Sequence, residues 1–257
     1  MVAPFRIVIP SRFASSRLPG KPLRKLAGKT MIQRVWEQAV HAGAEEVWVA
    51  TDDDRIAAVV SQFGGQVCMT SKAHSSGTDR LAEVARNQGF PGDSIIVNLQ
   101  GDEPGIPPNL LTQVASSLAA RPDVGIATVA TPIRSSVELF DPNAVKVVID
   151  EHGTAHYFSR APIPWVRDAF SAGPPAELPK DVLFLRHIGL YAYRTDTLLA
   201  VASAAPAVNE QAESLEQLRA LSMGLSIHVS VIPEAPAHGI DTEADLERAQ
   251  AYFAGAA

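Results

Sequence analysis

The sequence predicts an α/β fold in which a mostly parallel central sheet carries helices on both faces. Short apolar runs rich in β-branched residues alternate with segments of helical periodicity over residues 1–120, an order typical of parallel sheets. After about residue 132 the pattern becomes strand-rich, and the α/β alternation returns near the C-terminus. We therefore expect a single α/β domain over residues 1–257, with a strand-rich insertion at 133–208.

The first half of the chain alternates expected strands with expected helices. Apolar runs too short for helices predict strands at 7–9, 47–50, 66–69 and 94–99. Helical spacing of apolar residues starts at Met31 and stops at Gly43, a natural C-cap. The run Asp52-Asp-Asp-Arg55 opens a second helix, and two more are expected at about 78–87 and 108–120.

The second half predicts a hairpin followed by a return to the α/β pattern. A turn at 150–153 joins strands expected at 145–149 and 154–159, and residues 183–194 are also strand-rich. A helix is expected at about 209–223 and a strand at 227–232. Thr242 caps a final helix, whose first turn carries acidic residues that the helix dipole favours.

The composition excludes several classes of protein. With a net charge of −6, broad binding to nucleic acid or to an anionic membrane is not expected. No stretch approaches the roughly 20 apolar residues that span a bilayer, and we expect no signal peptide. The single cysteine, Cys68, cannot form an intramolecular disulfide and lies in an apolar run. We therefore expect a packed thiol in a soluble, cytoplasmic protein.

A rigid, basic loop follows the first expected strand. Three prolines stiffen residues 10–22, and Gly20 permits close approach of the backbone. Arg12, Arg17 and Lys21 concentrate positive charge at the end of the strand, where ligands of α/β proteins bind. This loop predicts a site for a polyanion.

Two acidic loops follow other expected strands. Because the carboxyl ends of parallel strands meet at one edge of a sheet, residues 51–54 and 100–104 should lie near the basic loop. Cations beside carboxylates suit a complex of Mg²⁺ with a nucleotide. Asp102 lies too far ahead of the next helix to cap it, which favours a ligand role. The aspartates at 52–54 are more typical of a helix N-cap.

The segment 74–80 combines hydroxyl groups, a glycine and Arg80 just before a helix. Its backbone amides could hold a base or a phosphate, and Ser76 or Thr78 could equally be the N-cap. The histidines show no metal-binding spacing.

Two common nucleotide motifs are excluded. Residues 27–30, Ala-Gly-Lys-Thr, look like the end of a Walker loop, but Leu23 stands where the first glycine of that motif belongs. The fingerprint Gly-x-Gly-x-x-Gly of dinucleotide-binding enzymes is also absent from the sequence. A nucleotide would therefore have to bind without either motif.

Motifs along nearly the whole chain resemble the 3-deoxy-manno-octulosonate cytidylyltransferases, or CMP-Kdo synthetases, which act on the acidic sugar Kdo. Examples are Pro10-Ser-Arg12-Phe-Ala-Ser-Ser-Arg17-Leu-Pro-Gly-Lys21 and Asn98-Leu-Gln100-Gly-Asp102-Glu-Pro104. The matching segments are 9–23, 49–52, 68–70, 76–83, 97–104, 142–148, 157–165, 186–191, 215–219 and 239–246. The segments around 170–180 and 200–209 do not match clearly.

The resemblance implies a nucleotide-diphospho-sugar transferase-like, Rossmann-like fold and an enzyme of lipopolysaccharide biosynthesis. Its reaction would join CTP and Kdo into CMP-Kdo and release pyrophosphate. Mg²⁺ is the implied cofactor, and CTP and Kdo are the implied partners. The family likeness also suggests a homodimer built on the insertion.

The resemblance also implies roles for individual residues. Arg12, Lys21 and Asp102 would be the catalytic set, with Asp102 and Asp241 as the metal ligands. The implied nucleotide contacts are Pro10, Ser11, Arg12, Lys21, Ser76, Gly77, Arg80, Gln100 and Asp102. The implied contacts to the sugar are Arg17, Gln100, Arg160, His187, Tyr191, Glu216 and Gln217.

The departures from the family pattern are mild, and three alternatives remain. Ser11 and Ser16 stand where Ala and Thr are usual, and Asp79 stands where Glu is usual. A related acidic sugar, such as 8-amino-Kdo or sialic acid, could be the substrate. A uridylyl or guanylyl transferase is the second alternative, but those enzymes have a loop similar to Gly-x-Gly-Thr-Arg, which this chain lacks. A catalytically silent nucleotide-binding module would be expected to lose Asp102, Asp241 or Lys21.

Overall fold

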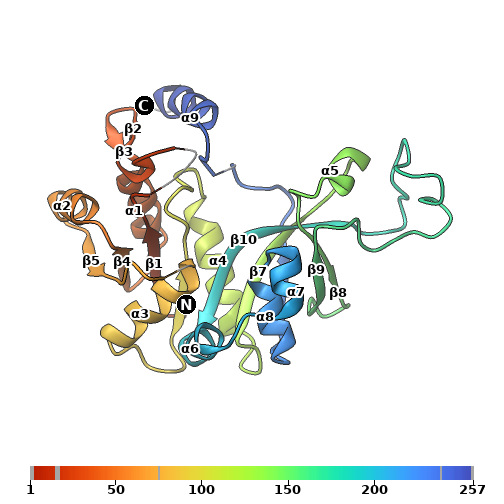
Figure 1. Cartoon of the computed structure of the whole chain (residues 1–257), viewed down its shortest axis with the longest axis horizontal. Helices are drawn as coiled ribbons and strands as arrows, with labels where there is room; N and C mark the ends of the chain where they lie inside the picture. The colour runs from red at the N-terminus through yellow and green to blue at the C-terminus, as the bar shows by residue number, and fades with distance from the viewer. Residues whose placement is uncertain (1–2, 15–17, 75, 238, 256–257) are drawn as a thin grey trace.

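The computed structural model describes residues 3–14, 18–74, 76–237 and 239–255 (Figure 1). Its main sheet has the strand order β11-β7-β10-β6-β1-β4-β5, with the hairpin β8–β9 attached through β10. The bounds of the ordered strands are β1 (Phe5–Ser11), β4 (Glu46–Thr51), β5 (Gln66–Met69), β6 (Ile95–Asn98), β7 (Ile126–Pro132), β10 (Leu185–Arg194) and β11 (Ile227–Val231). The predicted α/β fold is confirmed.

The strand β10 runs against its neighbours. It pairs antiparallel with both β6 and β7, whereas β1 pairs parallel with β4 and β6. The first half of β10 therefore lies at the carboxyl ends of β6 and β7. Although β10 falls within residues 133–208, it lies inside the main sheet rather than outside it.

Helices cover both faces of the sheet, because each buried strand sends alternate side chains to opposite faces. On β1, Ile7 and Ile9 enter one core and Val8 enters the other. The first core packs against α1 (Met31–His41), α2 (Asp54–Gln62) and α4 (Pro108–Ala119). The second packs against α3 (Gly77–Asn87), α6 (Thr195–Ser203) and α8 (Gln217–Ser222).

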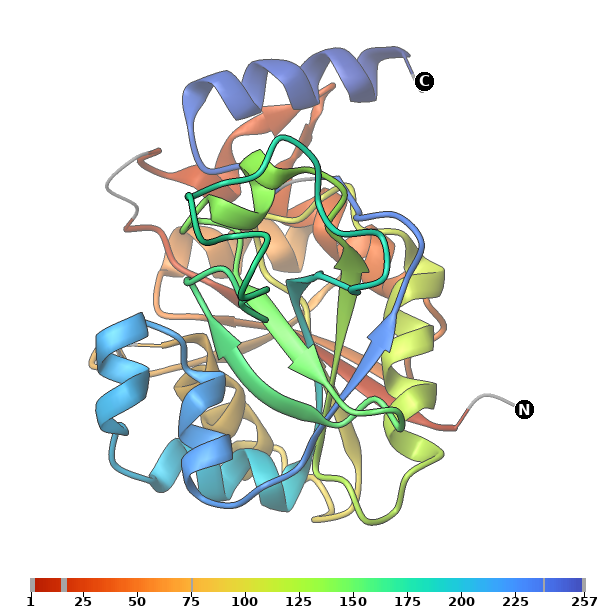
Figure 2. The same cartoon turned by 90° about the vertical axis from the view of Figure 1, so that its right-hand side faces the viewer.

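An arm projects from one end of the sheet (Figures 1 and 2). It comprises the hairpin of β8 (Lys146–Ile149) and β9 (Ala155–Ser159), the helix α5 (Ser136–Phe140) and the long loop 160–184. A small core of its own holds it together, made of Ile133, Leu139, Phe170 and Phe184. The fully buried Lys146 stabilises the base of the arm, because its Nζ donates to the carbonyl oxygens of Asp141 (2.8 Å) and Arg160 (2.6 Å).

The single helix predicted at 209–223 is wrong. The structure has two short helices there, α7 (Val208–Glu213) and α8, because Ser214 takes a left-handed conformation with φ of 52°. The elements β7, α5 and α6 were not predicted. The seven residues of β7 include two alanines and two threonines, which give a weak hydrophobic pattern although nearly all of them are buried.

The resemblance of residues 27–30 to a Walker loop does not extend to structure. Gly28, with φ of 84°, lies in the turn between β2 (Lys25–Leu26) and β3 (Lys29–Thr30). The Thr30 side chain caps α1 by accepting from the backbone of Gln33. The 3-10 helix η1 (Lys21–Leu23) precedes this hairpin, and the last helix, α9 (Glu243–Gly255), packs against β2. None of the described helices is long and apolar enough to cross a membrane.

Candidate active site

One cavity of about 370 Å³ lies where β1 and β6 end. Its wall comes from the basic loop, the loop after β6 and the segment before α9. The lining residues are Pro10, Ser11, Arg12, Ala14, Lys21, Pro22, Gly77, Gln100, Gly101, Asp102 and Asp241. The predicted convergence of the basic loop and the 100–104 loop is therefore seen, and we call this space the nucleotide cavity.

Lys21 lies between the two carboxylates predicted to bind a metal. Its Nζ is 2.6 Å from Oδ2 of Asp102 and 2.9 Å from Oδ1 of Asp241. Burial opposes the charged ammonium, but the two carboxylates outweigh burial and raise the pKa of Lys21. A backbone bond from Ile240 to the carbonyl of Asp102 (2.9 Å) brings these distant segments together.

Gly20 sets the direction of the chain just before Lys21. It has φ of 65°, and a Cβ placed there would lie 3.2 Å from the ring of Phe13. Glycine is favoured at this position, because a side chain would be both strained and crowded.

A second cavity of about 370 Å³ adjoins the first, since Gly77 and Gln100 line both. Its wall comes from β6, β10, the start of α3 and the turn between α7 and α8. The lining residues are Gly77, Thr78, Asn98, Gln100, Glu103, His187, Gly189, Tyr191, Tyr193, Ser214, Leu215, Glu216 and Gln217. It contains five residues predicted to contact an acidic sugar, and we call it the acceptor cavity.

The backbone of β10 shapes one wall of the acceptor cavity. The pairing of β10 with β7 is irregular between Ile188 and Tyr191. At this irregularity the hydroxyl of Thr128 donates to the carbonyl of Leu190 (2.8 Å) and lies 3.0 Å from Nε2 of His187. The shift places His187, Gly189 and Tyr191 along the same wall.

The break between α7 and α8 shapes the opposite wall. The carboxylate of Glu213 accepts from the Ser159 hydroxyl (2.6 Å) and from the backbone N–H of Arg160 (2.7 Å). The next turn carries Ser214, Leu215, Glu216 and Gln217 into the cavity. The hydroxyl of Thr78 then donates to Glu216 (2.7 Å), which joins this turn to the start of α3.

Burial sets the protonation of several groups in the acceptor cavity. It lowers the pKa of His187 to about 3, so the imidazole is neutral. It raises the pKa of Glu103 to about 8, with a further contribution from the neighbouring Asp102. Burial also raises the pKa of Tyr191 well above its usual value. The acceptor cavity is therefore polar but carries few charges.

Asn98 and Glu103 line this cavity but were missed as candidates. Asn98 is the last residue of β6, within the apolar run at 94–99, and Glu103 follows Asp102 in the acidic loop. The signal that could have found Asn98 is a polar residue at the carboxyl end of an otherwise apolar strand.

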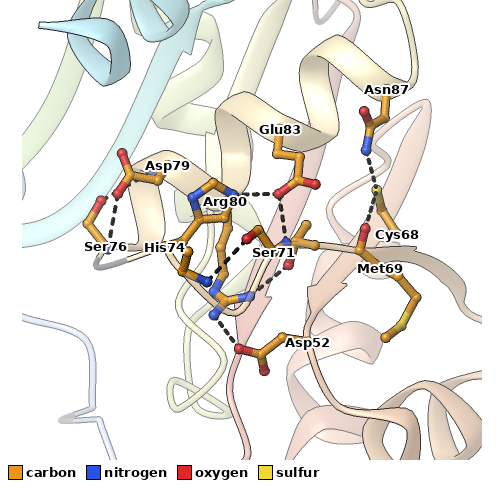
Figure 3. Close-up of polar contacts among 12 residues, drawn as sticks. Asp52, Cys68, Met69, Ser71, His74, Ser76, Asp79, Arg80, Glu83 and Asn87 are labelled. Carbon is orange, nitrogen blue, oxygen red and sulfur yellow. Dashed lines mark hydrogen bonds and ion pairs between the residues drawn. The ribbon is translucent and has the colours of Figure 1, made fainter.

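Arg80 and Ser76 lie outside the residues that line either cavity. Arg80 is 1% exposed, and its guanidinium donates to Thr70 (2.7 Å) and, as Figure 3 shows, to Asp52 (2.6 Å). Ser76 and Asp79 form a capping box at the start of α3. The side chains of these two predicted nucleotide contacts therefore bond to other groups of the protein.

Arg160 also lies apart from the lining residues of both cavities. Arg160 donates from Nε to the carbonyl of Glu213 (2.6 Å) and from Nη1 to the carbonyl of Pro142 (2.9 Å). Arg17 lies outside the described residues, so its predicted contact with the sugar is not placed. The expected N-cap role of the 52–54 aspartates is confirmed for Asp53, which accepts from Arg55.

A larger cavity, of about 720 Å³, lies between α5 and the loop at 174–180. None of the predicted site residues is among its described lining residues. Glu177 is the carboxylate among its described lining residues, whereas most of the predicted site residues line the two smaller cavities.

The chain is similar to known cytidylyltransferases in both sequence and structure. The cytidylyltransferase family model matches residues 6–227. The 3-deoxy-manno-octulosonate cytidylyltransferase of Vibrio parahaemolyticus is 55% identical over 97% of this chain and 98% of its own, and that of Pseudomonas syringae pv. syringae is 53% identical over 99% and 100%. The solved structure of a CMP:2-keto-3-deoxy-manno-octonic acid synthetase complexed with CTP superposes with a TM-score of 0.89 at 43% identity, covering 99% of this chain and 100% of the other. This chain belongs to the 3-deoxy-manno-octulosonate cytidylyltransferase family.

Proposed function

We infer that this protein transfers the CMP group of CTP to the anomeric hydroxyl of Kdo, giving CMP-Kdo for lipopolysaccharide biosynthesis and pyrophosphate. The observation that carries the inference is the pair of adjoining cavities, of which one is lined by two cations and two carboxylates and the other is polar. Relatives of that name match almost the full chain, and a solved relative was complexed with CTP.

The reaction needs positioning and charge neutralisation more than covalent help from the protein. The hydroxyl oxygen of the sugar forms a bond to the α-phosphorus, the bond from that phosphorus to the β-phosphate oxygen breaks, and the hydroxyl proton is released. Gly77 and Gln100 line both cavities, so the two reacting groups would meet beside them. Arg12 and Lys21 would offset the charge of the leaving pyrophosphate.

We propose Mg²⁺ as the cofactor, held by Asp102 and Asp241. Their oxygens are close enough to share one cation, since both lie within 2.9 Å of the Lys21 ammonium. Within the described ranges no group of three or more His, Cys, Asp or Glu could hold a metal ion. The remaining ligands would be phosphate oxygens and water, as is usual for Mg²⁺ in nucleotide enzymes. When bound, the ion would neutralise charge on the triphosphate.

We also propose a homodimer joined through the arm, in the cytoplasm. The arm exposes large apolar side chains, with Val137 84%, Leu183 59% and Trp165 55% exposed. Cys68 is a buried, free thiol, as expected, which fits a reducing compartment. Sedimentation equilibrium tests the dimer, and Trp165→Glu is expected to shift it toward monomer.

The function is tested by pyrophosphate release from each nucleoside triphosphate, with and without Kdo. We expect release with CTP and Kdo together, and little with ATP, GTP or UTP. Replacing Kdo by 8-amino-Kdo or sialic acid identifies the preferred acceptor. The absence of turnover with every triphosphate would contradict an enzymatic function.

A further inference from the structure

Two residues that line the acceptor cavity each carry a buried polar oxygen without a partner among the described residues. Asn98 is 4% exposed, and its Oδ1 has no hydrogen-bond partner among the described residues. Within the same described set, Oε2 of Glu103 is also buried and without a partner. Both residues line the acceptor cavity. Such atoms are uncommon in folded proteins and call for an explanation.

The position of Asn98 is fixed by the sheet. It is the last residue of β6, paired on one side with Val8 of β1 and on the other with Tyr191 of β10. A side chain held between two central strands cannot turn away to find another partner. An apolar residue would satisfy the core better there, because a buried amide with an unmade hydrogen bond costs free energy. The amide is therefore suited to a group that enters the cavity.

The chemistry of the two side chains indicates what that group is. An amide both donates and accepts hydrogen bonds, and a carboxyl oxygen can bond a hydroxyl in either protonation state. Glu216 adds a second carboxyl group to the wall of this cavity, whereas the cations Arg12 and Lys21 line the nucleotide cavity. Hydroxyl groups are therefore favoured beside Glu103 and Glu216, whereas the carboxylate of an acidic sugar would lie away from these two side chains.

We propose that Asn98 and Glu103 determine acceptor specificity by hydrogen-bonding hydroxyl groups of the sugar. Both line the acceptor cavity together with Gln100, which also lines the nucleotide cavity. Sites that hydrogen-bond a substrate hydroxyl reject analogues that lack it, because their buried polar groups are then left unpaired. The inference rests on the proposed function, since it assumes that a sugar enters this cavity.

The test combines variants with sugar analogues. Asn98→Leu keeps a similar volume and removes the amide, and Glu103→Gln keeps the shape and changes the hydrogen-bonding pattern. Each is assayed with Kdo and with analogues that each lack one hydroxyl group. Asn109→Leu and Glu151→Gln, at exposed positions, are the matched controls.

We expect Asn98→Leu to lower kcat/KM for Kdo by about 10–100-fold and to change the Kd of CTP by less than about threefold. For at least one deoxy analogue, the kcat/KM of the wild type should be lower than for Kdo by a similar factor. With that analogue, Asn98→Leu should cause no further loss of kcat/KM. Glu103→Gln should show the same pattern with a hydroxyl group of its own. The two controls should behave as the wild type.

Equal losses for Kdo and for every analogue would overturn the inference, as would an equal loss of CTP affinity. If Asn98→Leu does not fold, as judged by circular dichroism, the Glu103→Gln series decides by the same criteria. A wild-type protein that binds CTP but fails to use Kdo overturns the proposed function, and the inference with it. If the wild type uses Kdo but each variant lowers kcat/KM by the same factor with Kdo and with every deoxy analogue, this inference alone is overturned.

Discussion

At the scale of single residues, Lys21 forms ion pairs with two carboxylates that come from distant parts of the chain. Asp102 follows β6 and Asp241 precedes α9, and the ammonium lies within hydrogen-bonding distance of both. Asp102 and Lys21 could be predicted from the sequence because each follows a strand and has no capping role. Asp241 could not, because by its position it also suits the start of a helix. The backbone bond from Ile240 to Asp102 and the ion pair with Lys21 bring it to the site.

Asp102→Asn should keep the fold and lower turnover by roughly 10²–10³, because it removes one preorganised charge from the nucleotide cavity. Steady-state pyrophosphate release measures the effect, and circular dichroism checks the fold. Asp123→Asn, at an exposed position, is the matched control. Activity within about threefold of the wild type would refute the role of Asp102.

Lys21→Met should tighten divalent-cation binding in the absence of nucleotide by about tenfold while lowering turnover. The ammonium competes with a metal ion for the same two carboxylates, and its removal leaves their charge uncompensated. Titration with Mn²⁺, followed by electron paramagnetic resonance, measures the affinity directly. Lys29→Met, whose lysine pairs with Glu37 elsewhere on the surface, is the control. Weaker Mn²⁺ binding by Lys21→Met would show that no such competition exists.

At the scale of elements, the break between α7 and α8 builds one wall of the acceptor cavity. The residues at 209–223 are compatible with a continuous helix, so their sequence does not reveal the break. The cause is tertiary: Glu213 bonds to Ser159 and to the backbone of Arg160, which anchors α7 to the arm. These contacts outweigh the local helix propensity, and the chain turns at Ser214.

Glu213→Ala should raise the KM for Kdo severalfold while leaving the KM for CTP nearly unchanged. The variant leaves the Arg160 N–H without its acceptor and frees the turn that carries Glu216 and Gln217. It should also lower the free energy of unfolding by about 1–3 kcal/mol. Two-substrate kinetics and urea denaturation measure both effects, and Glu177→Ala in the exposed arm loop is the control. Equal changes in the two KM values would place the effect outside the acceptor cavity.

At the scale of the whole molecule, the alternation of strands and helices made the fold class predictable, but not the direction of β10. Its pairing with β6 and β7 depends on contacts between residues far apart in the chain. That reversal creates the acceptor cavity, because it brings His187 and Tyr191 to the carboxyl edge of the sheet. The sequence could therefore indicate a nucleotide site, whereas the family resemblance was needed for His187, Tyr191, Glu216 and Gln217 of the second cavity, and Asn98 and Glu103 were missed.

Stability should depend on pH through Glu103. Its pKa is about 8 in the folded protein and about 4.5 when exposed, so the folded state keeps a proton that the unfolded state loses between these values. Raising the pH from 5 to 8 should therefore destabilise the wild type relative to Glu103→Gln, by up to about 1.4 kcal/mol per pH unit. Urea denaturation at several pH values measures this difference, with Glu151→Gln as control. A difference that stays constant with pH would contradict the raised pKa.

The central claim is that the two adjoining cavities bring a nucleoside triphosphate and an acidic sugar together for transfer rather than hydrolysis. Phosphorus-31 nuclear magnetic resonance of the purified protein with CTP, Kdo and Mg²⁺ tests it most directly. We predict that one phosphodiester signal and pyrophosphate appear in equal amounts, and that neither appears without Kdo. Release of free CMP as the first product, or of CDP and phosphate, would contradict the account.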